Sequence, residues 1–199
     1  MYLVYFFQEE LEKSFRLESS NSELAQEYVQ SRIEQLRHEQ NRYVPLLLKN
    51  INDSNVDEEF LNNIFQKHPQ FQIIGKGGNG KTTSLKHLFF KCLEEFRKKE
   101  TEILPIFLNL SRIKHNSTVV SELAGLLSIK EDEIKEMLTN NQLLLFLDGL
   151  NEIHSAVDIE RVIHEINEIN EEFTELRIIL SSREDSDPQI NNYFNFPIF

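Results

Sequence analysis

The residues with the clearest chemistry form a glycine-rich run that ends in a lysine and two threonines, at positions 75–83. Four of the chain's six glycines stand there, and glycine lacks the Cβ atom that would keep backbone N–H groups away from an anion. A helix that starts near the end of the run would add the positive end of its dipole. We therefore predict a site for the phosphates of a nucleotide, formed by Gly75, Lys76, Gly77, Gly78, Asn79, Gly80, Lys81, Thr82 and Thr83.

Two side chains of this run have specific expected roles. The Lys81 ammonium would bind the β- and γ-phosphates, and the Thr82 hydroxyl would be a ligand of Mg²⁺. Residues 75–82 satisfy the pattern G-x-x-x-x-G-K-[ST], the P-loop, and they follow an apolar run that ends at Ile74, as the pattern requires. The alternative is a glycine-rich turn that only caps a helix.

The charge distribution favours the phosphate site. The chain carries a formal net charge of −12, but residues 66–115 contain ten Lys/Arg against four Asp/Glu. A locally basic segment within an acidic protein suits a small polyanion such as a nucleotide. The overall acidity argues against nucleic acid as a partner, because neutralising its phosphates needs a basic surface.

A second candidate group follows the apolar run at residues 143–147. Asp148 ends this run, and the carboxyl ends of parallel strands lie at one edge of a sheet, so we expect Asp148 to reach Mg²⁺ or its waters beside the P-loop. Gly149 follows and leaves space for the phosphates. Four residues after Asp148, Glu152 is the predicted general base that polarises an attacking water. The alternative for Glu152 is an acid at the start of the next helix.

A third candidate group, Ser181-Ser182-Arg183, ends the last apolar run. If this strand is inserted beside the P-loop strand, Arg183 or Ser182 would sense the γ-phosphate, whereas a surface salt bridge is the alternative for Arg183. The predicted catalytic residues are Lys81, Glu152 and Arg183. The six histidines show no metal-ligand spacing and no nucleophile set is compelling, which excludes zinc-enzyme and protease chemistry.

The elements that position these residues alternate between strands and helices. Apolar runs at 71–74, 103–110, 143–147 and 177–181 predict strands, and amphipathic stripes at 85–96 and 159–173 predict helices between them. Such alternation indicates a parallel α/β sheet. We predict a three-layer α/β P-loop fold with strand order 5-1-4-3-2, whose fifth strand is either missing or supplied by residues 195–199.

The domain prediction is an N-terminal helical extension at 1–42 and a P-loop domain at 43–199, with a short helix at 57–65. No stretch reaches the roughly 20 apolar residues of a membrane-spanning helix, so a membrane is not an expected partner. Cys92 is the only cysteine and stands on an apolar helix stripe, which predicts a core thiol in a reducing compartment and a cytoplasmic protein.

The segments 74–83, Leu147-Asp148-Gly149-Leu150-Asn151-Glu152 and Ser181-Ser182-Arg183 together resemble the NACHT family of signal-transducing STAND NTPases, over roughly residues 43–183. The Asp148-Gly149 pair carries the sharpest resemblance. Asn151 stands where the family often has Asp, which leaves Glu152 as the only acid of the usual pair. The resemblance implies a switch that is closed with ADP, opens and oligomerises with ATP, and serves innate or antiviral defence. It also implies a homo-oligomer or a partner chain.

The chain ends at Phe199, before the helical and winged-helix regions usual in the family, so we expect a C-terminally truncated domain. Such a domain would bind ADP and ATP with similar, weak affinity and would leave Tyr193, Phe194, Phe196 and Phe199 uncovered. Two other functions remain open: a nucleotide-binding interaction module without turnover, and a P-loop small-molecule kinase. No Asn-Lys-x-Asp motif is present, which favours ATP over GTP.

Overall fold

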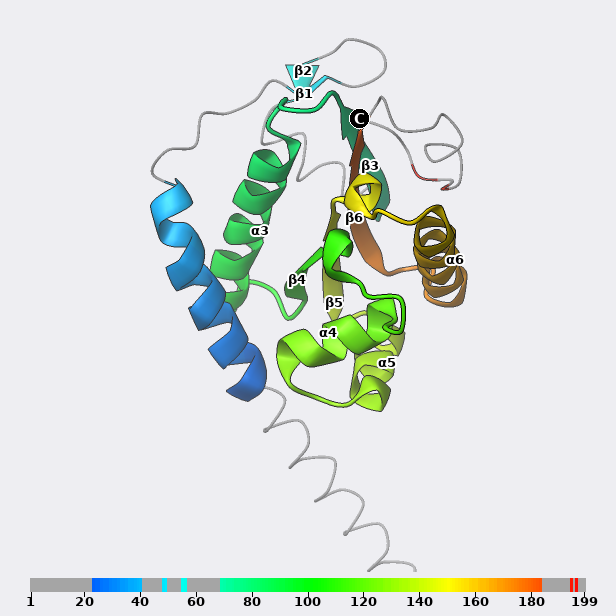
Figure 1. The fold of residues 1–199 in the computed structure, drawn as a ribbon. Helices are drawn as coiled ribbons and strands as arrows, with labels where there is room; N and C mark the ends of the chain where they lie inside the picture. Colours follow the sequence, from blue (N-terminus) through cyan, green and yellow to red (C-terminus); the bar gives the residue numbers. More distant parts are fainter. Residues whose placement is uncertain are drawn as a thin grey trace, which may run out of the picture.

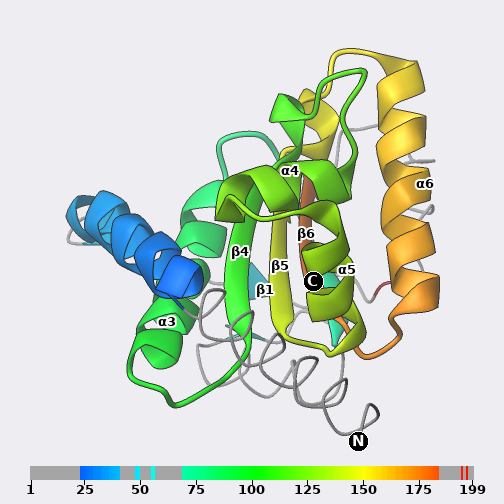
Figure 2. The ribbon, with the colours of Figure 1, turned by 90° about the horizontal axis from the view of Figure 1, so that it is seen from below.

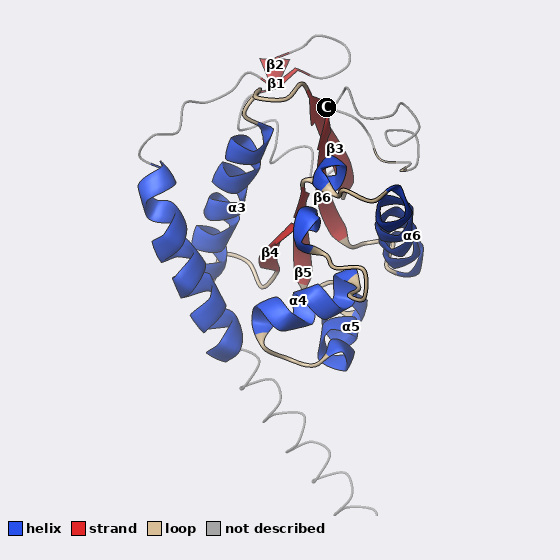
Figure 3. Ribbon diagram, viewed as in Figure 1, coloured by secondary structure: helices blue, strands red, loops and turns tan. Residues whose placement is uncertain are grey.

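The computed structural model describes residues 23–40, 48–49, 55–56, 69–183, 194 and 196. Within them, a parallel sheet forms the middle layer and helices cover both of its faces (Figure 1), as the red strands between blue helices show in Figure 3. The chain therefore has the predicted three-layer α/β fold. The predicted helix at 57–65 lies outside the described residues, as do the first 22 residues of the N-terminal extension.

The sheet has four strands in the order β3-β6-β5-β4, all of them parallel. In chain order this is 1-4-3-2, the predicted arrangement, and the described residues include no further strand beside β3. A separate two-stranded antiparallel pair consists of β1 (Leu48–Lys49) and β2 (Asn55–Val56). The strands of the main sheet are β3 (Gln70–Gly75), β4 (Leu104–Asn109), β5 (Leu143–Asp148) and β6 (Arg177–Arg183).

Helix α3 (Lys81–Arg97) covers one face of the sheet, on the side opposite α6 (Ala156–Glu172) (Figure 1). Its Phe89 ring lies 5.5 Å from the ring of Phe107 on β4 and 5.3 Å from that of Phe146 on β5, measured between centroids. Edge-to-face and tilted aromatic contacts of this kind add to the burial of apolar area. Both helices confirm the predicted stripes.

Two short helices between β4 and β5 were not predicted: α4 (Val119–Leu127) and α5 (Glu131–Thr139). Ser128 separates them in the left-handed conformation, with φ 58°. Each helix has only nine residues, so its apolar positions fill little more than two turns and the helical period is hard to recognise in the sequence.

A helix at residues 23–40 packs against α3 and reaches the outer edge of β4 (Figure 2). At that edge the Tyr28 hydroxyl accepts a hydrogen bond from the backbone N–H of Phe107, at 3.3 Å. Lys86 of α3 forms an ion pair with Glu39 at 3.1 Å. The buried residues of the helix share the core of the P-loop fold, and they are Ala25, Tyr28, Val29, Ile33 and Leu36.

One expectation about the C-terminal aromatic residues is wrong. Phe194 and Phe196 are buried, with 4% and 5% of their surface exposed, and their ring centroids lie 5.3 Å apart. The side-chain amide of the fully buried Gln72 on β3 donates a hydrogen bond to the Phe194 carbonyl at 3.5 Å. These aromatic rings therefore cover core surface; Tyr193 and Phe199 lie outside the described residues.

Searching the described residues for a helix with the length and apolar character of a membrane span finds none.

Candidate nucleotide-binding site

The P-loop, residues 75–82, connects the end of β3 to the start of α3. Gly80 is the N-cap of α3 in the left-handed conformation, with φ 76°, and no side chain caps the helix. By contrast, the N-termini of α4 and α6 are capped by the hydroxyls of Thr118 and Ser155. The first turn of α3 also contains no acid. The first N–H groups of α3 are therefore not capped by a side chain, and they form a positive helix end to which an anion can bind.

Lys81 lies over this loop. Its ammonium Nζ donates to the carbonyl oxygens of Gly75 at 2.5 Å and Lys76 at 2.9 Å. A Cβ atom on Gly75 would lie 3.6 Å from Cδ of Lys81, so the lysine stem rests on the start of the loop. Thr82 and Thr83 follow at exposed positions. The Lys81 ammonium, predicted to bind the phosphates, is thus held at the loop. Lys76 and Asn79, also on the loop, are exposed.

Asp148 lies at the same edge of the sheet, at the end of β5. It is 5% exposed, and its Oδ1 accepts a hydrogen bond from the Ser181 hydroxyl of β6. Strand β6 lies between β3 and β5, so its end separates the P-loop strand from the acid strand. Ser181 belongs to a predicted motif, but its hydrogen bond to Asp148 was not predicted, because it depends on which strands are neighbours.

Gly149 makes the turn that follows Asp148, with φ 81°. A Cβ atom at this position would lie 3.2 Å from both Oδ1 of Asn109 and Oε2 of Glu152. Asn109 ends β4 and pairs with Asp148 across the sheet, and its Oδ1 accepts from the backbone N–H and hydroxyl of Ser111 at 2.9 and 2.6 Å. Asn109 was not among the predicted site residues, although a polar residue that ends the apolar run of a strand was a signal for it.

Glu152 and Arg183 approach each other after this turn. Glu152 belongs to the short 3-10 helix η2 (Leu150–Glu152), and its Oε1 lies 3.8 Å from NH2 of Arg183. The Arg183 guanidinium lies beside Gly77, where a Cβ atom would be 3.9 Å from its Cζ. Both charged side chains are about half exposed, whereas Ser182 is buried. Of the two residues predicted to sense the γ-phosphate, only Arg183 is thus exposed beside the P-loop.

The oxygen donors predicted for Mg²⁺ are the Thr82 hydroxyl and the Asp148 carboxylate. No group of three or more His, Cys, Asp or Glu side chains in the described ranges could hold a metal ion. Mg²⁺ is usually bound by one or two protein oxygens together with phosphates and waters. Thr82 and Asp148 could supply those two oxygens once a nucleotide occupies the uncapped end of α3.

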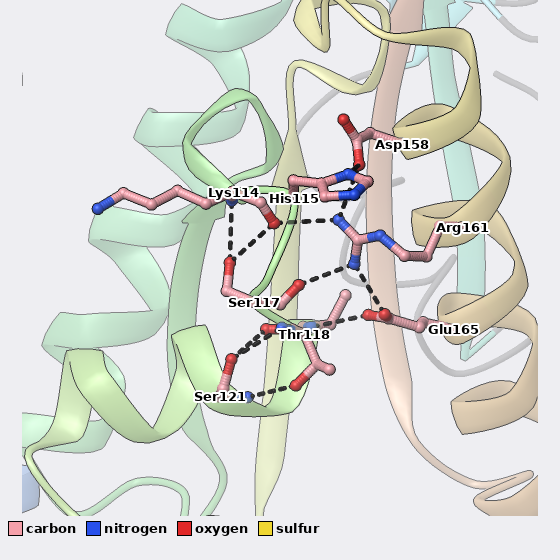
Figure 4. A network of polar contacts seen from close by, with 9 residues as sticks. Lys114, His115, Ser117, Thr118, Ser121, Asp158, Arg161 and Glu165 are labelled. Carbon is pink, nitrogen blue, oxygen red and sulfur yellow. Dashed lines mark hydrogen bonds and ion pairs between the residues drawn. The ribbon is translucent and has the colours of Figure 1, made fainter.

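A polar network, which we call the Arg161 clasp, joins the first half of α6 to the loop that precedes α4 (Figure 4). Arg161 donates to the carbonyls of Ser117 at 2.7 Å and Lys114 at 3.1 Å, both in the loop before α4. It also pairs with Glu165 at 2.9 Å, whose other oxygen accepts from the backbone N–H of Val119, the first residue of α4. The Arg161 clasp therefore joins α6 to the loop that follows β4.

The acid of this network is Asp158, on the first turns of α6. It lies 3.0 Å from Nδ1 of His115 and 3.4 Å from the Arg161 guanidinium. The hydrogen bond from His115, aided by that from Arg161, lowers the pKa of Asp158 below its ordinary value. The carboxylate form is the one that the folded clasp favours.

Similar solved structures include Cdc6p from Pyrobaculum aerophilum, with 20% identity and a TM-score of 0.42 over 70% of this chain and 41% of that chain. The Caenorhabditis elegans PCH-2 structure gives 18% identity and 0.40 over 69% and 39%. The replication initiator DnaA, bound to AMPPCP and single-stranded DNA, gives 20% identity and 0.43 over 70% and 43%.

The chain spans about two-fifths of the length of these three structures. No curated protein matches its sequence. The NACHT domain family model matches residues 70–198, which include the P-loop, Asp148, Glu152 and the end of β6. The chain therefore belongs to the NACHT domain family, whose P-loop NTPase fold implies nucleotide binding.

Proposed function

We propose that this chain binds Mg-ATP, hydrolyses it slowly and acts as a nucleotide-dependent switch of the NACHT type. The observation that carries the proposal is the uncapped, acid-free start of α3, with Lys81 held over the loop and Asp148 at the same edge of the sheet. A triphosphate supplies the negative charge that such a helix end favours.

Each residue has a proposed role in binding. The backbone N–H groups from Gly75 to Thr83, including those of Lys76, Gly77 and Asn79, surround the phosphates, and Lys81 neutralises the β- and γ-phosphates. Thr82 and Asp148 hold the metal. Bound Mg²⁺ would neutralise charge on the transferring phosphate oxygens. Ser181 holds one oxygen of Asp148, which fixes the orientation of the carboxylate.

Slow turnover is supported by the pairing of Glu152 with Arg183. Glu152 is the proposed base, and it lies 3.8 Å from the Arg183 guanidinium. A γ-phosphate at the loop would attract Arg183, which already lies beside Gly77. In this proposal ATP draws Arg183 towards the phosphate and leaves Glu152 to orient water, whereas ADP does not. That difference between the two nucleotides is what a switch requires.

The switch itself, and its service in innate or antiviral defence through a homo-oligomer or partner chain in the cytoplasm, rest on the NACHT family alone. A nucleotide-binding module without turnover is the second candidate. It is favoured by Asn151, because Glu152 is then the only acid following Asp148 in η2.

The test is calorimetric titration of the 199-residue chain with Mg-ATP and Mg-ADP, combined with phosphate release. Lys81→Ala should weaken Mg-ATP binding by about tenfold or more, because it removes the charge-assisted contact to the phosphates. Lys98→Ala is the matched control, since Lys98 is exposed at the other end of α3. Equal affinities for the two variants would refute the site. Binding without any phosphate release would favour the module.

A further inference from the structure

The end of β6 extends past its neighbour on one side only. Its pairing with β5 ends at Leu147↔Leu180, whereas its pairing with β3 continues to Gly75↔Arg183. The chain leaves β5 after Asp148, because Gly149 turns it into η2. Beyond Leu180, β6 is no longer in register with β5, so a backbone N–H that points to that side bonds an acceptor outside β5.

For Arg183, the side chain of Asn151 is that acceptor. Asn151 of η2 accepts the backbone N–H of Arg183 through Oδ1, at 3.1 Å. This bond joins residues 32 positions apart in the sequence. It ties the backbone just before Glu152 to the backbone from which the Arg183 side chain extends.

The hydrogen bond between Asn151 and Arg183, which we call the tie, lies next to the ion pair of Glu152 and Arg183. Glu152 follows Asn151 directly, and its Oε1 is 3.8 Å from NH2 of Arg183. The same guanidinium lies beside Gly77 of the P-loop. A shift of η2 relative to β6 would change the distance between Glu152 and Arg183 and the place of each above the loop.

We propose that Asn151 is a positioning residue that keeps Glu152 and Arg183 aligned over the P-loop; its role in turnover rests on the proposed function. An amide oxygen accepts this N–H without adding a negative charge beside Asp148, Glu152 and a polyphosphate. Aspartate at 151 could accept the same bond, but alanine could not. In this proposal Asn151 acts as a structural acceptor, through the positions of Glu152 and Arg183.

The tie is tested first without nucleotide, by hydrogen exchange of the Arg183 amide. Asn151→Ala should speed this exchange by about tenfold, the effect of losing one ordinary hydrogen bond. Asn151→Asp should keep the protection, and so should the control Asn140→Ala, which changes an exposed asparagine at the end of α5. Unchanged exchange in Asn151→Ala would overturn the tie.

The second measurement is phosphate release at saturating Mg-ATP. Asn151→Ala should lower kcat by about tenfold while the ATP affinity stays within about twofold, and Asn151→Asp should recover most of the rate. In a Glu152→Gln/Arg183→Ala background, Asn151→Ala should cause no further loss of rate. A residue that merely stabilises the fold would lower the rate in every background, together with the thermal midpoint, and that result would overturn positioning.

The two measurements separate this inference from the function on which it rests. Wild-type chain that binds Mg-ATP without releasing phosphate would overturn the role in turnover together with the proposed hydrolysis. The amide measurement still decides whether Asn151 ties η2 to β6. Faster exchange with an unchanged kcat would show that the tie exists but does not position the site, and would also overturn the proposal.

Discussion

The Ser181 hydroxyl donates a hydrogen bond to Oδ1 of Asp148, and the two side chains are 2% and 5% exposed. A carboxylate that has lost most of its water needs such a donor, because an unpaired buried charge is costly. The bond also links β6 to β5 beyond the last paired residues, Leu147 and Leu180. The proposed metal ligand is therefore held by the strand that separates it from the P-loop strand.

Ser181→Ala should lower the free energy of unfolding by about 1–3 kcal/mol, since it leaves the Asp148 carboxylate without this donor. It should also weaken the Mg²⁺ dependence of ATP binding. Ser84→Ala is the matched control, because the Ser84 hydroxyl on α3 is buried and has no hydrogen-bond partner among the described residues. Denaturant unfolding and Mg²⁺ titration check both effects. Similar stability losses in the two variants would show that the Ser181 bond contributes nothing specific.

Asp148→Asn and Glu152→Gln should affect different steps, the first nucleotide binding and the second hydrolysis. The first removes a proposed metal ligand, so Mg²⁺-dependent ATP binding should weaken. The second should keep binding and slow hydrolysis by about 10²-fold, because only the proposed base is lost. Glu160→Gln, an exposed acid of α6, is the control. Wild-type hydrolysis by Glu152→Gln would leave Glu152 as a simple acid of η2.

The Arg161 clasp should stabilise the fold because the planar Arg161 guanidinium donates to several acceptors at once. Arg161→Lys keeps the charge but cannot reach the Ser117 and Lys114 carbonyls and two carboxylates together, so unfolding free energy should fall by about 1–3 kcal/mol. Arg112→Lys, at an exposed position of η1 (Leu110–Arg112), is the matched control. An equal thermal midpoint for the two lysine variants would contradict this role.

The same clasp predicts a pH dependence. The folded state lowers the pKa of Asp158, chiefly through His115, so its stabilising effect is present above the ordinary value of 3.8. That effect is lost as pH falls through the folded-state value. The stability difference between wild type and Asp158→Asn should therefore disappear on acidification. A difference that persists in acid would show that Asp158 acts through something other than its charge.

Tyr28→Phe should destabilise the edge of the sheet. The variant keeps the buried ring and removes the oxygen that accepts the Phe107 N–H, so it should cost about 1 kcal/mol. Burial also raises the pKa of the Tyr28 hydroxyl, as expected for a group held neutral in the core. Hydrogen exchange at the Phe107 amide reports the bond directly. If that exchange does not change, the helix at 23–40 does not protect this edge.

The strands of the main sheet were predictable because each is an apolar run, and β5, buried over its whole length, is the clearest case. The P-loop was predictable because its glycines, Lys81 and Thr82 lie together in the sequence. The contacts of Ser181 and Asn151 were not, because each joins two strands or their loops and requires the lateral order of the sheet. Phe194 was misjudged for the same reason, since Gln72 is far from it in sequence.

The backbone conformation and close contacts of Gly149 restrict which residues can occupy position 149. Its φ of 81° disfavours any side chain, and a Cβ atom would press on Asn109 and Glu152 at 3.2 Å. Gly125, inside α4, has nothing within 4 Å of such an atom, so alanine there should be neutral or favourable. In a library of all single substitutions selected for nucleotide binding, position 149 should be strongly enriched in glycine, whereas position 125 should accept many residues.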